Sequence, residues 1–198
     1  MPFRLGMLGM WHTHANGIVR QACAHPEEFS LVGFYDPDPA VVAARRETWG
    51  AQVPGFRLFD RPEELLEQPL DGVVVEGQVY QNLELARQAL ERGLPVMLEK
   101  PAGANRIAHR ELVTLARSRG LHVQMIYLFR YMSAVQEMLR LQAAGAFGEV
   151  YHFRARLPKV LEDYPRYLED FAWHPGGIYF EMAGHVIDLM VAVLGRPE

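Results

Sequence analysis

Residues 3–36 read FRLGMLGMWHTHANGIVRQACAHPEEFSLVGFYD, and this stretch decides the fold. The short apolar run Phe3–Leu8 predicts a buried strand. Apolar residues then recur at helical spacing over Ala15–Ala24, and a second apolar run, Phe29–Tyr35, follows. Strand, helix and strand in this order predict a right-handed βαβ unit with two parallel strands.

The same alternation continues to about residue 126. Further strands are expected at Phe56–Phe59 (weak), Gly72–Val75, Pro95–Leu98 and His122–Ile126, with helices at Ala40–Trp49, Pro62–Glu67, Asn82–Arg92 and Ile107–Ser118. Short turns rich in glycine and proline join these segments. The pattern predicts an α/β domain over residues 1–126, built on a doubly wound, Rossmann-type parallel sheet.

Residues 127–198 have a different pattern. Helical spacing marks Ser133–Ala144 and Ile178–Leu194, whereas Val150–Leu157 alternates with a period of two, as half-exposed antiparallel strands do. One antiparallel strand is not a sheet. We therefore expect the start of an α+β second domain, with most of its antiparallel sheet missing and the chain truncated.

Composition excludes several classes of protein. The chain has 198 residues, of which 22 % are charged and 49 % hydrophobic, with a net charge of −4, an ordinary globular profile. The slight acidity gives no electrostatic footprint for nucleic acid or anionic lipid, and no stretch approaches the ~20 apolar residues of a membrane span. The single cysteine, Cys23, and a start without signal-peptide features suit a cytoplasmic protein.

The first strand–turn–helix is where a dinucleotide pyrophosphate would bind, on backbone N–H groups at a helix N-terminus. The three glycine positions of that fingerprint hold Gly9, Trp11 and His14. Asp36, at the end of the second strand, supports a dinucleotide, because a carboxylate there accepts from a ribose diol and favours NAD over NADP. Two alternatives stay open: a turn that binds no nucleotide, and Asp36 as the cap of the next helix.

Two histidines in this loop, His12 and His14, raise the question of a metal. The sequence shows neither a shared helical face nor further ligands for them, so we expect no metal site. As imidazoles beside a phosphate site, they are expected to donate hydrogen bonds to it.

A second group with chemical potential is Glu99-Lys100-Pro101, which closes the Pro95–Leu98 strand at the carboxyl edge of the sheet. The chain has 18 arginines and only two lysines, so its general use of positive charge does not explain a lysine at this edge. An ammonium group is a compact charge whose pKa can fall far enough to exchange protons. The alternative is an exposed loop lysine.

The last predicted helix carries Glu181, His185 and Asp188 at i, i+4 and i+7, on one face. A carboxylate one turn before a histidine can pair with it and raise its basicity. The alternative is a solvated helix face.

Together these segments resemble the glucose–fructose oxidoreductase/inositol dehydrogenase (Gfo/Idh/MocA) family along essentially the whole chain. The resemblance rests on three stretches in the family's order: residues 89–101 (ALERGLPVMLEKP), residues 144–150 (AGAFGEV) after Arg130, and residues 176–189 (GGIYFEMAGHVIDL). Glu181 stands where the family usually has aspartate, and Gly77 where it has threonine.

The resemblance implies catalytic roles for Lys100, His185 and Glu181, with His185 taking the proton of a substrate hydroxyl and Lys100 holding the developing alkoxide. The cofactor is expected to be NAD, and NADP less so. Cofactor contacts are expected from Gly9, Trp11, His12, His14, Asp36, Gly77, Glu99, Lys100 and Pro101. Substrate contacts are expected from Lys100, Arg130, His174, Glu181 and His185.

The function that this predicts is an NAD-dependent oxidoreductase acting on a sugar, polyol or related hydroxy or keto compound, homo-oligomeric through its C-terminal domain. Two alternatives remain. One is a non-catalytic family member that binds a ligand or another protein, and the other is an enzyme that uses the hydride step within a redox-neutral reaction.

Overall fold

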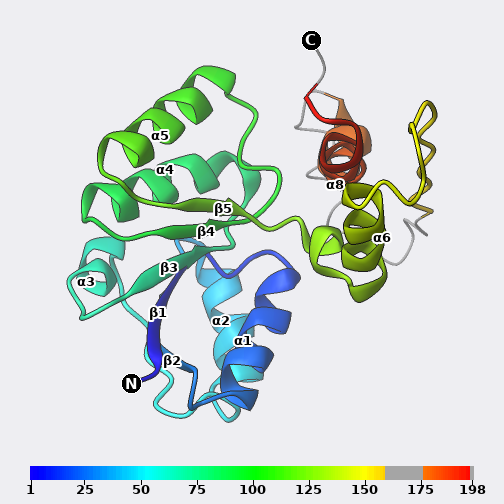
Figure 1. Ribbon diagram of the computed structural model, residues 1–198. Coiled ribbons are helices and arrows are strands. Elements are labelled where there is room, and N and C mark those ends of the chain that lie inside the picture. Colours follow the sequence, from blue (N-terminus) through cyan, green and yellow to red (C-terminus); the bar gives the residue numbers. More distant parts are fainter. Residues whose placement is uncertain (159–175, 197–198) are drawn as a thin grey trace. The chain divides into compact units, whose positions relative to one another are not determined.

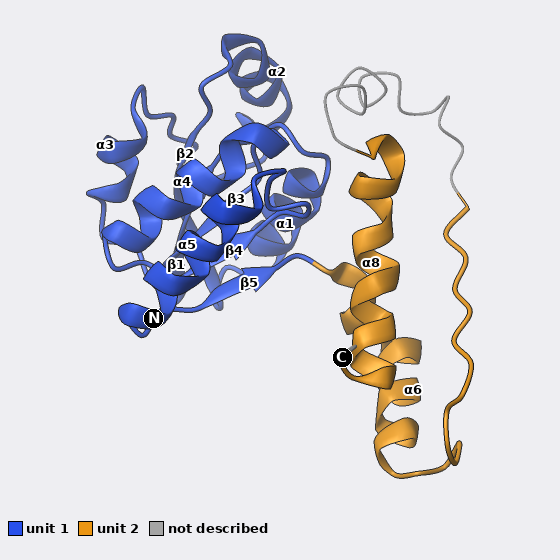
Figure 2. Ribbon diagram, turned by 90° about the horizontal axis from the view of Figure 1, so that it is seen from above, with its two compact units in different colours: residues 1–126 blue, residues 127–198 orange. Residues whose placement is uncertain are grey.

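The computed structural model describes residues 1–158 and 176–196 of the chain. It divides into two compact units, residues 1–126 and residues 127–198 (Figure 2). The predicted contact residue His174 lies outside the described residues.

The first unit is built on a five-stranded parallel sheet (Figure 1). The strand order is β2-β1-β3-β4-β5, with β1 Phe3–Leu8, β2 Phe29–Tyr35, β3 Gly72–Val75, β4 Val96–Leu98 and β5 Val123–Met125. Every neighbouring pair runs parallel. The Rossmann-type sheet predicted from the alternation of strands and helices is confirmed.

Helices cover both faces of this sheet (Figure 1). They are α1 His14–Ala24, α2 Pro39–Trp49, α3 Pro62–Leu66, α4 Val79–Glu91 and α5 Arg106–Ser118. Two separate hydrophobic cores result: α1 and α2 contribute Val19 and Trp49 to one, and α3, α4 and α5 contribute Leu66, Leu85 and Leu112 to the other. The sheet is therefore doubly wound.

The run of valines in β3 follows from this burial on two faces. Val73 and Val75 pack into the core beneath α3, α4 and α5, whereas Val74 packs into the core beneath α1 and α2. All three are at most 1 % exposed. A strand buried on both sides has no polar position, so its sequence is continuously apolar.

The crossovers place a topological switch point between β1 and β3. The chain goes from β1 to β2 on one side and then returns to β3 on the other side of β1. Ligands of open α/β sheets bind at the carboxyl ends of strands at such a point. Gly9 and Gly77 meet here: Gly9 has φ 80°, and a Cβ on it would lie 2.3 Å from the Gly77 nitrogen. Only glycine fits at position 9.

Two predicted segments of the first unit differ by more than a one-residue shift at an end. Phe56–Phe59 forms no strand, because it makes only a single bridge, Leu58 to Phe34, at the edge of β2. Helix α4 begins at Val79, three residues before the predicted Asn82. Gln78 caps it in a reciprocal box with Gln81, and glutamine is not a residue that ordinarily signals a helix start.

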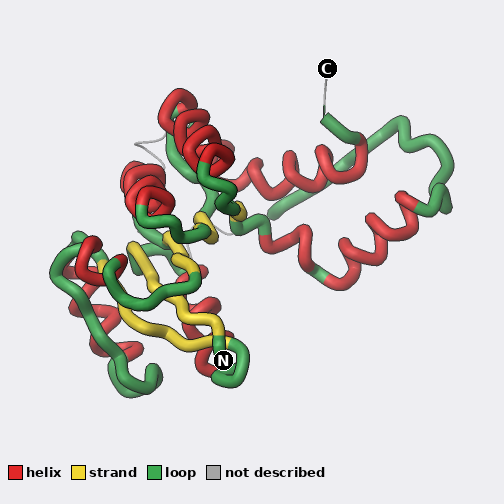
Figure 3. Tube along the Cα trace, turned by 60° about the vertical axis from the view of Figure 1, so that its left-hand side comes forward, coloured by secondary structure: helices red, strands yellow, loops and turns green. Residues whose placement is uncertain are grey.

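The described part of the second unit contains a 3₁₀ turn, Leu128–Tyr131 (η1), and the helices α6 Ser133–Ala143 and α8 Gly177–Leu194. The two helices confirm the predicted ones. The antiparallel strand predicted over Val150–Leu157 is wrong: residues 151–158 are drawn as loop in Figure 3. A strand needs a hydrogen-bonded neighbour, and no pairing with this segment occurs within residues 1–158 or 176–196.

Helix α8 also corrects the expectation about membrane spans. Its 18 residues have a mean hydropathy of 1.5, enough by length and composition to cross a bilayer, and 11 % of them are buried. It carries three ionisable residues, Glu181, His185 and Asp188, and ionisable groups inside a bilayer are costly. This stripe makes α8 a poor membrane span.

Candidate functional site

The β1–α1 loop, residues 9–13, lies at the switch point and is held there by its own backbone donors. The Met10 N–H donates to Asp36, the His12 N–H donates to the Glu76 carbonyl at 3.0 Å, and the His14 N–H donates to Nδ1 of His12 at 3.2 Å. Trp11 is half-buried, with its ring 6.1 Å from the His12 ring. The loop is therefore held by hydrogen bonds from the backbone N–H groups of every second residue, 10, 12 and 14.

Asp36, at the end of β2, binds backbone rather than a helix end. Its Oδ2 accepts from Met10 N–H at 2.5 Å and its Oδ1 from Asp38 N–H at 2.9 Å. The cap of α2 is Asp38, which accepts from Ala40 N–H at 2.8 Å, so the alternative of Asp36 as the helix cap is wrong. Burial raises the pKa of the Asp36 carboxyl.

Arg45 of α2 is a site residue that the sequence reasoning missed. It is 8 % exposed, and its guanidinium donates to the Met10 carbonyl at 2.7 Å and to the His12 carbonyl at 3.3 Å. A third bond reaches Oδ1 of Asn16 at 2.7 Å. Val41 and Trp49 lie four residues before and after Arg45, so the sequence alone places Arg45 on the same, buried face of α2. This spacing could have identified it. Arg45 therefore holds the β1–α1 loop to α2 through these hydrogen bonds.

Two histidines and two glutamates meet beside the loop. Nδ1 of His14 lies 2.8 Å from Oε2 of Glu99, and Nδ1 of His12 lies 3.4 Å from the same oxygen. Oε2 of Glu76 lies 3.6 Å from Nδ1 of His12. The sequence showed no further ligand for the two histidines, but the fold brings the carboxylates of Glu76 and Glu99 to them.

Glu76, the residue after β3, was not predicted as a site residue. Its side chain is fully buried, and its pKa is raised well above the ordinary range, first by burial and then by the charge of the Glu99 carboxylate. Residues 72–75 are all valine or glycine, so the strand appeared to continue as a purely structural element. Glu76 directly follows the last residue of a buried strand, and this position alone could have marked it as a candidate site residue.

Glu99-Lys100-Pro101 follows β4 at the same edge. Glu99 N–H continues the sheet by donating to the Val75 carbonyl at 3.0 Å, and Oε1 of Glu99 accepts from Lys100 N–H at 2.8 Å. The Lys100–Pro101 peptide is cis. Lys100 is buried, so the alternative of an exposed loop lysine is wrong.

In the second unit, α8 presents Glu181 and His185, both of which are buried. The His185 ring stacks on Phe129 of η1, with centroids 4.5 Å apart and planes inclined by 22°. Tyr127 meets the same ring edge-on at 6.0 Å and also contacts α8 at Gly184, where a Cβ would lie 3.3 Å from it. Two aromatic rings thus fix the imidazole plane, and the alternative of a solvated helix face is wrong for these two residues.

Arg130, predicted as a substrate contact, is bound within its own unit. Its guanidinium donates to both carboxylate oxygens of Asp188, at 2.6 and 2.9 Å. This bidentate pair joins η1 to α8. The third member of the predicted helix stripe is therefore structural, and it holds the segment that carries Phe129.

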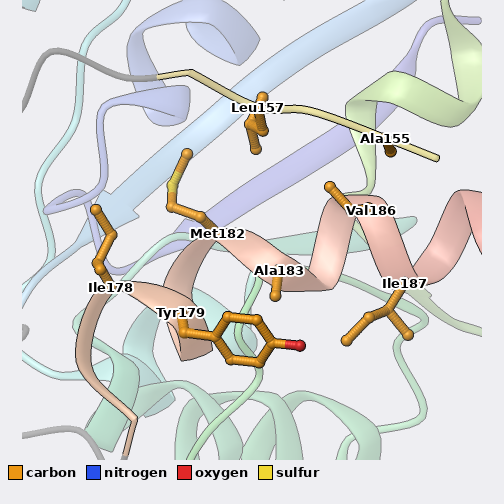
Figure 4. Close-up of a pocket in the computed structure, with 8 residues that line it drawn as sticks. All are labelled: Ala155, Leu157, Ile178, Tyr179, Met182, Ala183, Val186 and Ile187. Atoms are coloured by element: carbon orange, nitrogen blue, oxygen red, sulfur yellow. The ribbon is translucent and has the colours of Figure 1, made fainter.

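An apolar groove of about 460 Å³ runs along α8 (Figure 4). Leu157 of the extended segment lies over the helix, and the groove is lined by Ala155, Leu157, Ile178, Tyr179, Met182, Ala183, Val186 and Ile187. Sugars and polyols need several hydrogen-bond partners, and the Tyr179 hydroxyl is the single polar side-chain group of this lining. The groove does not suit such a ligand.

The predicted residues thus fall into two sets. Gly9, Trp11, His12, His14, Asp36, Gly77, Glu99, Lys100 and Pro101 all lie at the carboxyl edge of the sheet in the first unit. Arg130, Glu181 and His185 belong to the second unit. The structure gathers the first set around the switch point, where a dinucleotide fold binds its ligand.

Comparison with known proteins gives the family. The model of the Gfo/Idh/MocA oxidoreductases, described as an oxidoreductase family with an NAD-binding Rossmann fold, matches residues 3–127. The chain belongs to this family. The family resemblance inferred from the three sequence stretches is confirmed.

Several curated Gfo/Idh/MocA relatives are similar in sequence. The uncharacterized oxidoreductase YdgJ of Escherichia coli is 27 % identical over 169 residues, covering 84 % of this chain and 49 % of that protein. The trans-1,2-dihydrobenzene-1,2-diol dehydrogenase of Macaca fuscata fuscata is 32 % identical over 139 residues, covering 69 % of this chain and 41 % of that protein. The chain thus spans about half the length of the curated relatives it matches.

Solved Gfo/Idh/MocA structures share the fold. The scyllo-inositol dehydrogenase of Lactobacillus casei with bound NAD(H) and scyllo-inositol superposes with a TM-score of 0.83 at 17 % identity, covering 98 % of this chain and 57 % of that one. The myo-inositol 2-dehydrogenase of Lactobacillus plantarum gives a TM-score of 0.83 at 18 % identity, with the same coverage of 98 % and 57 %.

Proposed function

We propose that the protein is an NAD-dependent oxidoreductase that transfers hydride between a nicotinamide cofactor and a sugar, polyol or related hydroxy or keto compound. The observation that carries this proposal is the placement of Lys100. It is buried, it follows β4 at the ligand-binding edge of the sheet, and it lies inside the stretch that matches the family model.

The residues at the switch point fit a dinucleotide. Asp36 uses one acceptor position on each oxygen for backbone N–H groups, and a carboxylate has about four, so it can also accept from a ribose diol. Its charge disfavours a 2′-phosphate, which supports NAD over NADP. At the phosphate end, Gly9 has φ 80° and α1 begins at His14, with Trp11 and His14 at the positions of the other two glycines.

When bound, the nicotinamide would accept hydride from the substrate carbon. Lys100 is assigned to the oxygen on that carbon: its ammonium stabilises the developing alkoxide, an effect typically worth ~10²–10³-fold in rate. His185 is assigned to the hydroxyl proton, as a general base whose ring plane is fixed by Phe129 and Tyr127. Glu181, one helical turn earlier on α8, is assigned to orient His185.

Other expectations stay predictions. Arg130 and His174 as substrate contacts, homo-oligomers through residues 127–198 and a cytoplasmic location are among them. The apolar groove along α8 favours the expectation of an oligomer, because such a face is usually covered by protein.

Thermal unfolding of the full chain with NADH and with NADPH tests the cofactor assignment. A ligand at 100 times its dissociation constant stabilises by ~2.7 kcal/mol, which corresponds to roughly 5–10 °C for a chain of this size. We expect a shift of that size with NADH and a much smaller one with NADPH. No shift with NADH would contradict the proposal and favour a family member that does not bind the cofactor.

A further inference from the structure

Two buried carboxyl groups meet in the first unit, where β3 and β4 end. Glu76 directly follows β3 and Glu99 directly follows β4, and the side chain of each is at most 1 % exposed. The two strands pair in parallel, so their carboxyl ends lie at one edge of the sheet. Two carboxylates that share a buried site repel each other, and one of them then keeps its proton to a higher pH than an isolated carboxyl does.

The surroundings of the two carboxyl groups differ. Glu99 accepts from two N–H groups: the Lys100 backbone N–H lies 2.8 Å from Oε1, and Nδ1 of His14 lies 2.8 Å from Oε2. Hydrogen bonds of this kind favour the charged form of a carboxyl. Burial raises the pKa of Glu76 well above its ordinary value, and the charge of Glu99 and a hydrogen bond with its side chain add to this shift. The charge of Lys100 and the backbone N–H of Ala15 oppose the shift without cancelling it.

His12 supplies no proton to the pair. Its Nδ1 lies 3.6 Å from Oε2 of Glu76 and 3.4 Å from Oε2 of Glu99. The same nitrogen accepts the backbone N–H of His14 at 3.2 Å, and a ring nitrogen that accepts carries no proton. In the described part of the chain, the titratable groups that face Glu76 are His12, Glu99 and Lys100. The proton that joins the two carboxyl groups therefore belongs on Glu76.

We propose that Glu76 and Glu99 share one proton, held on Glu76, and that this bond positions Lys100 through Glu99. The role of Lys100 in this inference rests on the proposed function. Oε1 of Glu99 holds the Lys100 backbone N–H, so a shift of the Glu99 carboxylate displaces the residue that carries the ammonium group. With the proton present the two carboxyl groups attract each other, and without it they repel. Glu76 is a positioning residue, because it acts on Lys100 through Glu99.

Infrared spectroscopy tests the proton without substrate or cofactor, so its failure is distinct from failure of the proposed function. A protonated carboxyl has a C=O stretching band that an ionised carboxylate lacks. The difference spectrum between the wild-type full chain and Glu76→Gln should contain this band at neutral pH. Glu111→Gln, at an exposed residue of α5, is the matched control and should give no such band. Its absence from the Glu76→Gln difference spectrum would overturn the proposal.

The dependence of stability on pH gives a second test with a defined sign. When the folded pKa of a carboxyl is raised, its contribution to stability is complete below the unfolded pKa and is lost as pH rises through the folded pKa. Glutamine has no such proton to lose. Glu76→Gln should therefore gain stability relative to wild type between about pH 5 and pH 8, as measured by urea unfolding. A wild type that gains on the variant instead would mean that Glu76 is ionised and paired with Lys100, which contradicts the proposal.

Turnover tests the positioning of Lys100. Glu76→Gln keeps a neutral donor toward Glu99 and should retain wild-type kcat at neutral pH, whereas Glu76→Met has a similar length but no donor. We expect kcat to fall about 10-fold or more in Glu76→Met, since a small displacement of a positioned group can cost up to ~10²-fold. The dissociation constant for NADH should change little. Loss of kcat in Glu76→Gln, or wild-type kcat in Glu76→Met, would remove Glu76 from this role.

Discussion

The backbone N–H of Met10 donates to Oδ2 of Asp36 across 2.5 Å. The loop after β1 is thereby tied to the carboxylate that ends β2, and the same carboxylate holds the turn before α2 through Asp38 N–H. Under the proposed function, Asp36 both holds the loop at the phosphate end of the dinucleotide site and selects the ribose. Changes at this residue should affect stability and cofactor choice together.

Asp36→Ala should weaken NADH and remove the preference for NADH over NADPH. It should also lower the free energy of unfolding by ~1–3 kcal/mol, because the buried Met10 N–H loses its acceptor. Thermal unfolding with each dinucleotide measures both effects. Asp38→Ala is the control: it removes the cap of α2, which costs ~1 kcal/mol, and should leave the cofactor preference unchanged. An unchanged preference in Asp36→Ala would contradict the assignment.

Arg45→Met should destabilise the protein by at least ~2 kcal/mol, since the buried carbonyls of Met10 and His12 lose a charged donor. The melting temperature should fall by roughly 4–8 °C. Affinity for NADH should fall as well, because the loop is no longer clamped. The neighbouring exposed residue gives the control, Arg46→Met, which should change stability by less than ~0.5 kcal/mol. Equal melting temperatures for the two variants would show that the clamp is unimportant.

Lys100→Ala and His185→Ala should each reduce turnover at least ~10²-fold. Both residues are assigned to groups that change charge during the reaction, so the dissociation constant for NADH should change little. Steady-state kinetics and NADH titration of each variant separate the two effects. Turnover that survives in either variant would remove that residue from the mechanism.

The pair Arg130–Asp188 should be coupled more strongly than an ordinary surface pair. Its bonds are bidentate and Asp188 is 12 % exposed, so a double-mutant cycle with Arg130→Ala and Asp188→Ala should give about 1 kcal/mol. The exposed pair Arg140–Glu137 on α6 is the reference and should give a smaller coupling energy, because solvent screens it. Equal coupling energies would mean that the link between η1 and α8 contributes no special stability.

Asp71 should make stability fall in acid. Arg4 donates to both carboxylate oxygens of Asp71, and this hydrogen bonding lowers the pKa of Asp71 to about 2, well below the ordinary value for an aspartate. A carboxyl whose folded pKa is depressed stabilises the fold above its unfolded pKa, and this contribution is lost as pH falls toward 2. Asp71→Asn should therefore be slightly less stable than wild type at pH 6, with the difference shrinking below pH 4. Urea unfolding across this range measures it, and a difference that grows in acid would contradict the sign.

Most of the first unit could be predicted from sequence because its signals are local. Continuous valine in β3 and helical spacing in α1 and α5 specify buried strands and covering helices without knowledge of their partners. Val150–Leu157 was mispredicted for the opposite reason. Alternation specifies a face but not a neighbour, and a strand exists only when another strand pairs with it.

The candidate site was predictable where a residue follows a strand in a recognisable motif, as Asp36 and Lys100 do. It was not predictable where a polar residue lies inside an apparently structural element. Arg45 resembles one more helix-surface arginine, and its contact with the β1–α1 loop spans 35 residues of sequence. The meeting of Glu76 and Glu99 with two histidines depends on the strand order, which the sequence does not state.

The most direct test of the central claim is NADH production by the full chain with NAD and a panel of sugars and polyols. The account predicts substrate-dependent formation of NADH with at least one compound, abolished in both Lys100→Ala and His185→Ala. No NADH from any compound, with NAD shown to be bound under the same conditions, would contradict the assignment as a dehydrogenase.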